Sequence, residues 1–216
     1  MAQCVMLIGK SGSGKSTSMR NFSHDEMALI NVNKKPLPFK GKFDSTLETT
    51  QYEVVEKAIG QTQKKAIVID DAGYLITAFF MANQGANKGN NAFAKYSQMA
   101  EDFYTLIKFC QEKIDDDKIV YFVMHEDKNE FGEIKPKTIG KMLDEKVCIE
   151  GLFTIVLRAE CKEGKYIFHT KTDGLDVTKS PMGMFEEEEI DNDLKAVDKI
   201  IRDYYDLEPL SKKGDK

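Results

Sequence analysis

Short apolar runs alternate along the chain with stretches in which apolar residues recur at helical spacing. Four runs predict strands: Gln3–Ile8, Met27–Val32, Ala66–Ile69 and Ile119–Met124. Three stretches with one apolar face predict helices: Lys15–Phe22, Gln51–Gln61 and Asn91–Ile114. Strands that alternate with helices in this way are typical of a mostly parallel, doubly wound α/β sheet.

The pattern changes in the last third of the chain. Gly151–Arg158 and Lys165–Thr170 read as an antiparallel strand pair joined by a turn at Glu163 and Gly164. An acidic run, Glu186–Glu189, follows, and we expect Asp191 to cap a terminal amphipathic helix. The polar tail from residue 211 is expected to be disordered.

The most specific motif follows the first predicted strand directly. Gly9 to Ser16 read GKSGSGKS, which fits the phosphate-binding loop G-x-x-x-x-G-K-[ST] between a strand and a helix. Backbone N–H groups of such a loop cradle phosphates, its lysine reaches the β- and γ-phosphates, and its serine binds Mg²⁺. The residues expected to bind the phosphates of ATP are Gly9, Lys10, Ser11, Gly12, Ser13, Gly14, Lys15, Ser16 and Thr17.

A second motif ends the strand Ala66–Ile69, where two carboxylates, Asp70 and Asp71, follow four apolar residues. Ligands of open α/β sheets bind at this end of the strands. We expect Asp70 to hold Mg²⁺ together with Ser16, which gives the Walker B arrangement. Asp71 is the candidate to orient or deprotonate the attacking water; a helix cap or turn is the alternative for it.

His125 ends the next predicted strand, where a polar side chain can distinguish ATP from ADP; an ordinary turn residue is the alternative. Two long loops, 82–91 and 126–141, are expected at the same edge of the sheet, where partners would bind. Each could equally be a plain solvated loop. Lys135, Lys137 and Lys141 lie in a stretch of the second loop that has no acidic residue.

Composition narrows the choice of partners. The 216 residues carry a formal net charge of −5, so any nucleic-acid contact must come from a local patch. The four cysteines are scattered, which argues against a zinc site and for reduced thiols in the cytoplasm. No signal peptide or membrane span is apparent, so no membrane partner is expected.

Arginine is scarce, with Arg20, Arg158 and Arg202 the only ones in the chain. Nucleotide kinases and ring ATPases use arginines around the transferred phosphoryl group. A small-molecule kinase is therefore disfavoured, and a lysine is the better candidate for a residue that acts on a neighbouring nucleotide.

The chain resembles phage ATP-binding proteins with a RecA-like core. The resemblance rests on the phosphate-binding loop, IVIDD, the strand ending at His125, KPKTIGK from Lys135 and KSPMGMF from Lys179. These phage proteins are compact recombinases of the phage AAA-domain ATPase group. The resemblance covers about residues 3–185. It implies a RecA-like P-loop ATPase core over 1–185, followed by an acidic segment, a helix and a tail over 186–216.

The same resemblance implies a homo-oligomer with ATP at subunit interfaces and single-stranded DNA on loops 82–91 and 126–141. Lys141 would be the residue that reaches the neighbour's nucleotide. A phage single-strand-binding protein is a further implied partner, in the cytoplasm of a bacterial host. The chain departs from the family at the end of its second strand, where Asn31 and Asn33 stand and RecA-like proteins carry a catalytic glutamate.

We therefore expect a Mg²⁺-dependent ATPase that acts on single-stranded DNA in phage recombination or replication. Two alternatives remain: a nucleotide-gated binding module with little or no hydrolysis, and a P-loop kinase or motor.

Overall fold

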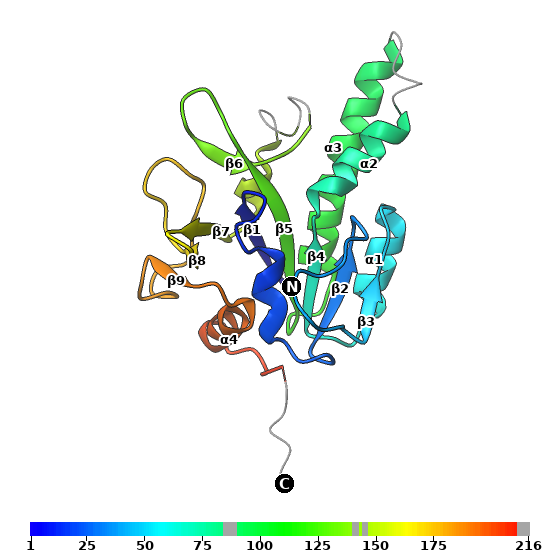
Figure 1. Cartoon of the computed structure of the whole chain (residues 1–216). Helices are drawn as coiled ribbons and strands as arrows, with labels where there is room; N and C mark the ends of the chain where they lie inside the picture. The colour runs from blue at the N-terminus through cyan, green and yellow to red at the C-terminus, as the bar shows by residue number, and fades with distance from the viewer. Residues whose placement is uncertain (84–89, 140–142, 144–146, 211–216) are drawn as a thin grey trace.

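A computed structural model of the chain describes residues 1–83, 90–139, 143 and 147–210. In this part of the chain nine strands form one sheet, with the order β3-β2-β4-β5-β1-β7-β8-β9 and β6 paired to β5 (Figure 1). The strands are β1 (Gln3–Gly9), β2 (Met27–Asn31), β3 (Ser45–Leu47), β4 (Ala66–Asp70), β5 (Ile119–Lys128), β6 (Ile134–Pro136), β7 (Ile155–Lys162), β8 (Lys165–His169) and β9 (Glu189–Asp191).

The strands from β3 to β7 in this order pair in parallel, and β8 and β9 extend the sheet in antiparallel fashion. β5 lies between β1, which leads into the phosphate-binding loop, and β4, which ends at Asp70. The predicted class, a mostly parallel α/β sheet with an antiparallel C-terminal part, is confirmed. The turn between β7 and β8 has positive φ at Glu163 and Gly164, as a tight hairpin turn requires.

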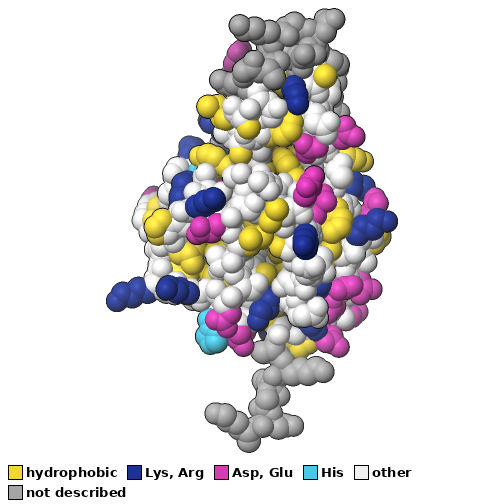
Figure 2. Space-filling model, turned by 90° about the vertical axis from the view of Figure 1, so that its right-hand side faces the viewer, with side chains coloured by type: hydrophobic (Ala, Val, Ile, Leu, Met, Phe, Trp, Pro, Cys, Tyr) yellow, Lys and Arg dark blue, Asp and Glu magenta, His cyan; other side chains and the backbone are white. Residues whose placement is uncertain are grey.

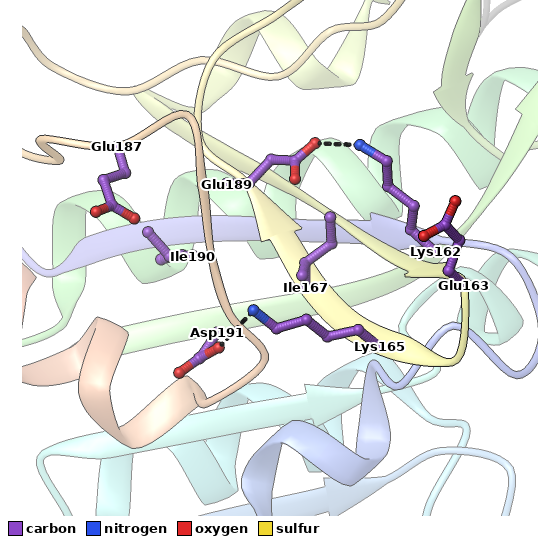
Figure 3. Close-up of a pocket in the computed structure, with 8 residues that line it drawn as sticks. All are labelled: Lys162, Glu163, Lys165, Ile167, Glu187, Glu189, Ile190 and Asp191. Atoms are coloured by element: carbon purple, nitrogen blue, oxygen red, sulfur yellow. Dashed lines mark hydrogen bonds and ion pairs between the residues drawn. The ribbon is translucent and has the colours of Figure 1, made fainter.

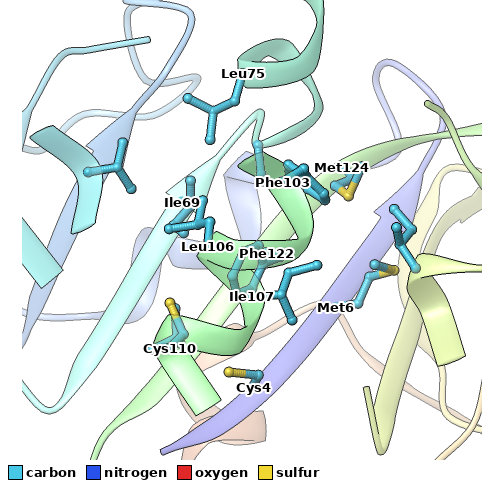
Figure 4. Close-up of a cluster of buried hydrophobic side chains, with 14 of the residues drawn as sticks. Cys4, Met6, Ile69, Leu75, Phe103, Leu106, Ile107, Cys110, Phe122 and Met124 are labelled. Carbon is cyan, nitrogen blue, oxygen red and sulfur yellow. The ribbon is translucent and has the colours of Figure 1, made fainter. Parts of the chain in front are cut away.

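Helices cover both faces of the sheet because the strand residues alternate between two apolar clusters. α1 (Tyr52–Gln61), α2 (Gly73–Asn83) and α3 (Asn90–Lys113) lie on one face. Their apolar residues pack against alternate residues of β1, β4 and β5, such as Met6, Ile69 and Phe122 (Figure 4). The short 3₁₀ helix η1 (Ser16–Asn21) and α4 (Leu194–Tyr204) cover the opposite face.

Seen from the side of α1–α3, the surface mixes charged residues with apolar ones (Figure 2). Apolar side chains are visible toward the projecting ends of α2 and α3, where Met81 is exposed. A second 3₁₀ segment, η4 (Ile149–Leu152), precedes β7. Within the described residues no helix is both long and apolar enough to cross a membrane.

Several features differ from the sequence prediction. β5 continues through His125 to Lys128 and forms a hairpin with β6, so His125 does not end its strand and part of loop 126–141 is sheet. Ala82 and Asn83 belong to α2, Asn90 and Asn91 belong to α3, and residues 84–89 lie outside the described residues.

Another difference concerns the end of the chain. Asp191 belongs to β9, where it pairs with Ile167, so it does not cap the last helix. Asp193 is the cap, because its side chain accepts hydrogen bonds from the backbone N–H groups of Lys195 and Ala196. The terminal helix itself, α4, buries Leu194, Val197 and Ile201 against the sheet, and the predicted disordered tail from residue 211 lies outside the described residues.

Candidate functional site

The phosphate-binding loop turns sharply at the end of β1. A Cβ atom on Gly9 would lie 2.5 Å from the Ser13 hydroxyl and 2.6 Å from the carbonyl oxygen of Ala159, so only glycine fits between the loop and β7. Gly12 and Gly14 have φ of +80° and +92°, which other residues rarely adopt. The sequence of the loop therefore specifies its backbone path, which leads into the first turn of η1.

Lys15 lies under this loop with only 5% of its surface exposed. Its Nζ donates hydrogen bonds of 2.7 Å to the carbonyl oxygens of Gly9 and Lys10. Burial lowers the pKa of Lys15 to about 8, although the nearby carboxylates of Asp71 and Asp70 oppose this shift. The ammonium group is therefore held in place at the centre of the loop, and a bound polyphosphate would favour its charged form.

Ser16 and Asp70 meet across the sheet end, 54 residues apart in sequence. The Ser16 hydroxyl donates a hydrogen bond of 3.0 Å to Oδ1 of Asp70. Burial raises the pKa of Asp70 to about 6, the charge of Asp71 adds to this shift, and the Ser16 hydrogen bond opposes it. A hydroxyl and a carboxylate oxygen at this spacing fit Mg²⁺, which takes few protein ligands and completes its shell with phosphate oxygens and water.

Asp71 follows directly, with φ of +58°, a left-handed backbone conformation that residues other than glycine adopt uncommonly. Its carboxylate accepts hydrogen bonds from Asn33 Nδ2 at 2.9 Å and Lys35 Nζ at 3.1 Å, and its Oδ1 lies 3.3 Å from Nε2 of His125. Burial acts to raise the pKa of Asp71, but the hydrogen bonds from His125, Asn33 and Lys35 outweigh it and hold this pKa well below its usual range. Asp71 is thus a firmly ionised carboxylate in a ring of donors.

His125 is half-buried within β5 and contacts Asp71 on one side. The ring of Tyr74 packs edge-on against it with 5.9 Å between centroids, and the Lys35 ammonium lies 5.2 Å from the Tyr74 ring centre. The histidine therefore links β5 to Asp71 through a direct polar contact.

One pocket of about 560 Å³ collects most of the predicted site residues. Its lining comprises Ser11, Gly12, Gly14, Lys15, Ser16, Thr17, Lys35, Pro36, Pro38, Asp70, Asp71, His125 and Tyr166. Gly9, Lys10 and Ser13 do not line it, but their backbone supports Lys15 and the loop turn. A neighbouring pocket of about 590 Å³ shares Ser11, Lys35 and His125 with it.

Sequence reasoning missed Lys35, Asn33, Tyr74 and Tyr166. Lys35 stands in a basic, proline-containing loop after β2, and the parallel pairing of β2 with β4 brings that loop to Asp71. Tyr166 reaches the phosphate-binding loop only because β8 lies two strands from β1. Nothing in the local sequence of either residue signals this contact.

A further pocket of about 560 Å³ is lined by residues of β7, β8 and β9 and their connections, away from the predicted residues (Figure 3). It is lined mainly by charged side chains, two pairs of which are close: Lys162 and Glu189 at 3.0 Å, and Lys165 and Asp191 at 3.6 Å. Its lining carries two lysines and four carboxylates, and both lysines lie close to a carboxylate, so the pocket does not fit an anionic ligand such as a phosphate.

The three arginines serve the fold. Arg20 donates to the carbonyl oxygen of Asn192, Arg158 pairs with the buried carboxylate of Glu126, and Arg202 pairs with Asp198. In the described part of the chain none of them lines the 560 Å³ pocket that contains Lys15, whereas Arg158 lines a smaller pocket of about 250 Å³ beside Lys10, Ser11, Gly12 and Ser13. Nor do the described residues contain a cluster of three or more His, Cys, Asp or Glu able to hold a metal by themselves.

The predicted partner loops are described only in part. Lys135 lies in β6 and Lys137 just after it, and the backbone N–H of Lys137 donates a 2.7 Å hydrogen bond to the carbonyl oxygen of His125. Lys141 lies outside the described residues, so the structure does not place it.

Comparison with known proteins agrees with this geometry. A family model described as an AAA domain matches residues 1–182, and a search of curated proteins found no match. The matched region includes the phosphate-binding loop, both aspartates and His125. Because the match covers most of the chain, the protein belongs to the AAA domain family of P-loop ATPases.

Proposed function

We propose that the protein is a Mg²⁺-dependent ATPase that acts on single-stranded DNA in phage recombination or replication, in the cytoplasm of a bacterial host. One observation carries the enzymatic part. A buried lysine, a serine–aspartate pair and an aspartate–histidine pair all face one pocket of about 560 Å³ at the end of the sheet.

Each group has a role that follows from its chemistry. Lys15 and the loop N–H groups bind the phosphates, and Ser16 and Asp70 would hold Mg²⁺. A bound Mg²⁺ would neutralise negative charge on the phosphate oxygens. Because the pKa of Asp71 is held low, this carboxylate is a weak proton acceptor, and we assign it to orienting the attacking water. We assign the sensing of the γ-phosphate to His125 because it contacts Asp71.

The hairpin β5–β6 supports the DNA part of the proposal. Its pairing starts at Glu126, next to His125, and Lys135 lies within it; Lys137, just after β6, lines the 590 Å³ pocket beside the nucleotide pocket. A strand of DNA held by these lysines would therefore act on the same element that contacts Asp71. We propose loop 82–91 as the second DNA contact, on the sequence alone.

We also propose that ATP lies at the interface of a homo-oligomer, with Lys141 of one subunit near the nucleotide of the next. The described residues support a lysine in this role indirectly, since no arginine among them lines the pocket. A phage single-strand-binding protein remains a proposed partner on the basis of the resemblance.

A specific observation favours the second candidate, a nucleotide-gated binding module with little hydrolysis. Asn31 and Asn33 stand at the end of β2, where the resemblance leads us to expect a catalytic glutamate. Asn33 and Lys35 both donate hydrogen bonds to Asp71. A carboxylate neutralised by Lys35 orients water less well than a free one.

Turnover of Mg-ATP with and without single-stranded DNA separates the two. An ATPase hydrolyses ATP at a rate that DNA increases and that Lys15→Ala abolishes. Binding of ATP with no turnover above the Lys15→Ala background in either condition would favour the binding module. Transfer of phosphate to a small acceptor would instead indicate a kinase.

A further inference from the structure

We infer that Tyr166 is the surface on which the base of the bound nucleotide stacks, and that this surface accepts purines with little discrimination. The inference rests on the proposed nucleotide-binding function and extends it to the base. The strand order provides its first support. Asp70 and His125 belong to β4 and β5, on one side of β1, whereas Tyr166 belongs to β8, on the other side.

This arrangement gives the pocket two ends. The aspartates and His125 mark the end where the terminal phosphate would lie, because Mg²⁺ and the attacking water are needed there. The nucleoside must then leave the phosphate-binding loop toward the opposite end. Tyr166 is the aromatic residue that lines the pocket at that end.

The alternation of β8 directs the ring toward the loop. Lys165 and Ile167 line the charged pocket of Figure 3, so Tyr166 between them points to the opposite face of the sheet. A Cβ atom on Gly14 would lie 2.8 Å from Cδ1 of Tyr166, which shows how closely the ring approaches the phosphate-binding loop. Even so, 46% of the tyrosine surface is exposed.

An exposed aromatic ring beside a phosphate site has a clear physical use. Every base has a π-face, so stacking on tyrosine contributes affinity regardless of the pattern of hydrogen-bond donors on the base.

The same lining argues for weak base discrimination. Strong rejection of the wrong base requires buried polar groups that pair with its edge. Among the described lining residues there is no Asn, Gln or Glu, and the two carboxylates, Asp70 and Asp71, lie at the phosphate end. We expect affinities for ATP and GTP to agree within about tenfold.

The test measures binding of Mg-ATP, Mg-GTP and Mg-tripolyphosphate by isothermal titration calorimetry. Tyr166→Ala should weaken ATP and GTP binding about tenfold or more but leave tripolyphosphate, which has no base, unchanged. Tyr166→Phe should bind all three as the wild type does. Tyr104→Ala is the control, since Tyr104 is similarly exposed, at 39%, and lies on α3 far from the loop.

Unchanged ATP binding by folded Tyr166→Ala would overturn the inference, as would an equal loss of tripolyphosphate. A wild-type preference of more than a hundredfold for one purine would overturn the claim of weak discrimination. If Tyr166→Ala fails to fold, Tyr166→Leu keeps the bulk on β8 without the ring and is judged by the same criteria. Failure of the wild type to bind any of the three ligands would instead refute the proposed function.

Discussion

Asp70→Asn should stabilise the nucleotide-free protein and at the same time weaken its binding of Mg-ATP. Asp70 is only 7% exposed, and among the described residues its carboxylate accepts one side-chain hydrogen bond, from Ser16, and a backbone hydrogen bond from Asp71. Burial, assisted by the charge of Asp71, raises its pKa from 3.8 to about 6. The folded protein thus holds a carboxylate that is poorly compensated until a cation arrives.

The sign and size of the effect follow from proton linkage. Because the folded state binds the Asp70 proton more tightly than the unfolded chain, this group causes stability to fall as pH rises from about 4 to about 6. The penalty is complete above that range. At about 1.4 kcal/mol for each pH unit between the two pKa values, it is at most about 3 kcal/mol. An uncharged asparagine can keep a hydrogen bond with Ser16 and removes the penalty.

Thermal unfolding followed by circular dichroism measures this change. For a chain of this size each kcal/mol corresponds to about 2–4 °C in Tm. Asp70→Asn should raise Tm by several degrees at pH 7.5, by less at pH 5, and hardly at all near pH 4. With Mg-ATP added, the wild type should have the higher Tm of the two proteins, since it binds the ligand more tightly and is stabilised more by it. A lower Tm for the variant at pH 7.5, or a gain that is independent of pH, would refute the reasoning.

Two further predictions concern turnover and DNA. Asp71→Asn should preserve Mg-ATP binding but lower the rate of phosphate release by a factor of about 10² or more, because an amide orients water less well than a carboxylate. Equal and mild effects of Asp71→Asn and Asp70→Asn on this rate would mean that both roles are wrongly assigned. Lys135→Ala combined with Lys137→Ala should lower affinity for single-stranded DNA and reduce its dependence on salt, measured by fluorescence anisotropy, while ATP binding is retained. Nucleotide-free protein that binds DNA as tightly as the ATP-bound form would contradict this mechanism.

The sequence predicts the sheet better than its edges. Buried central strands such as β1 and β4 carry continuous apolar runs, which show their position directly. β3 and β9 have three residues each and no apolar run, so only their pairing partners reveal them. α2 is apolar over most of its length because it packs against α3 and the sheet, and it therefore lacks the one-sided pattern that predicts a helix.

The same distinction applies to the site. The phosphate-binding loop and Asp70 were predictable, since their residue types at fixed spacing follow from the chemistry of phosphate and Mg²⁺. Lys35 and Tyr166 were not, because they reach the pocket through strand order. The sequence also does not decide which residue caps α4, because Asp191 and Asp193 are equally suited as helix caps. The pairing of β9 with β8 uses Asp191 and leaves Asp193 as the cap.

The central claim is that the loop from Gly9 to Ser16 binds the phosphates of Mg-ATP through Lys15. Isothermal titration calorimetry of wild type and Lys15→Ala with Mg-ATP tests it most directly, with circular dichroism to show that both are folded. The account predicts a single site in the wild type and a loss of affinity of at least about 10²-fold in the variant, since the buried ammonium group is held at the centre of the loop. Equal affinities in two folded proteins would contradict it.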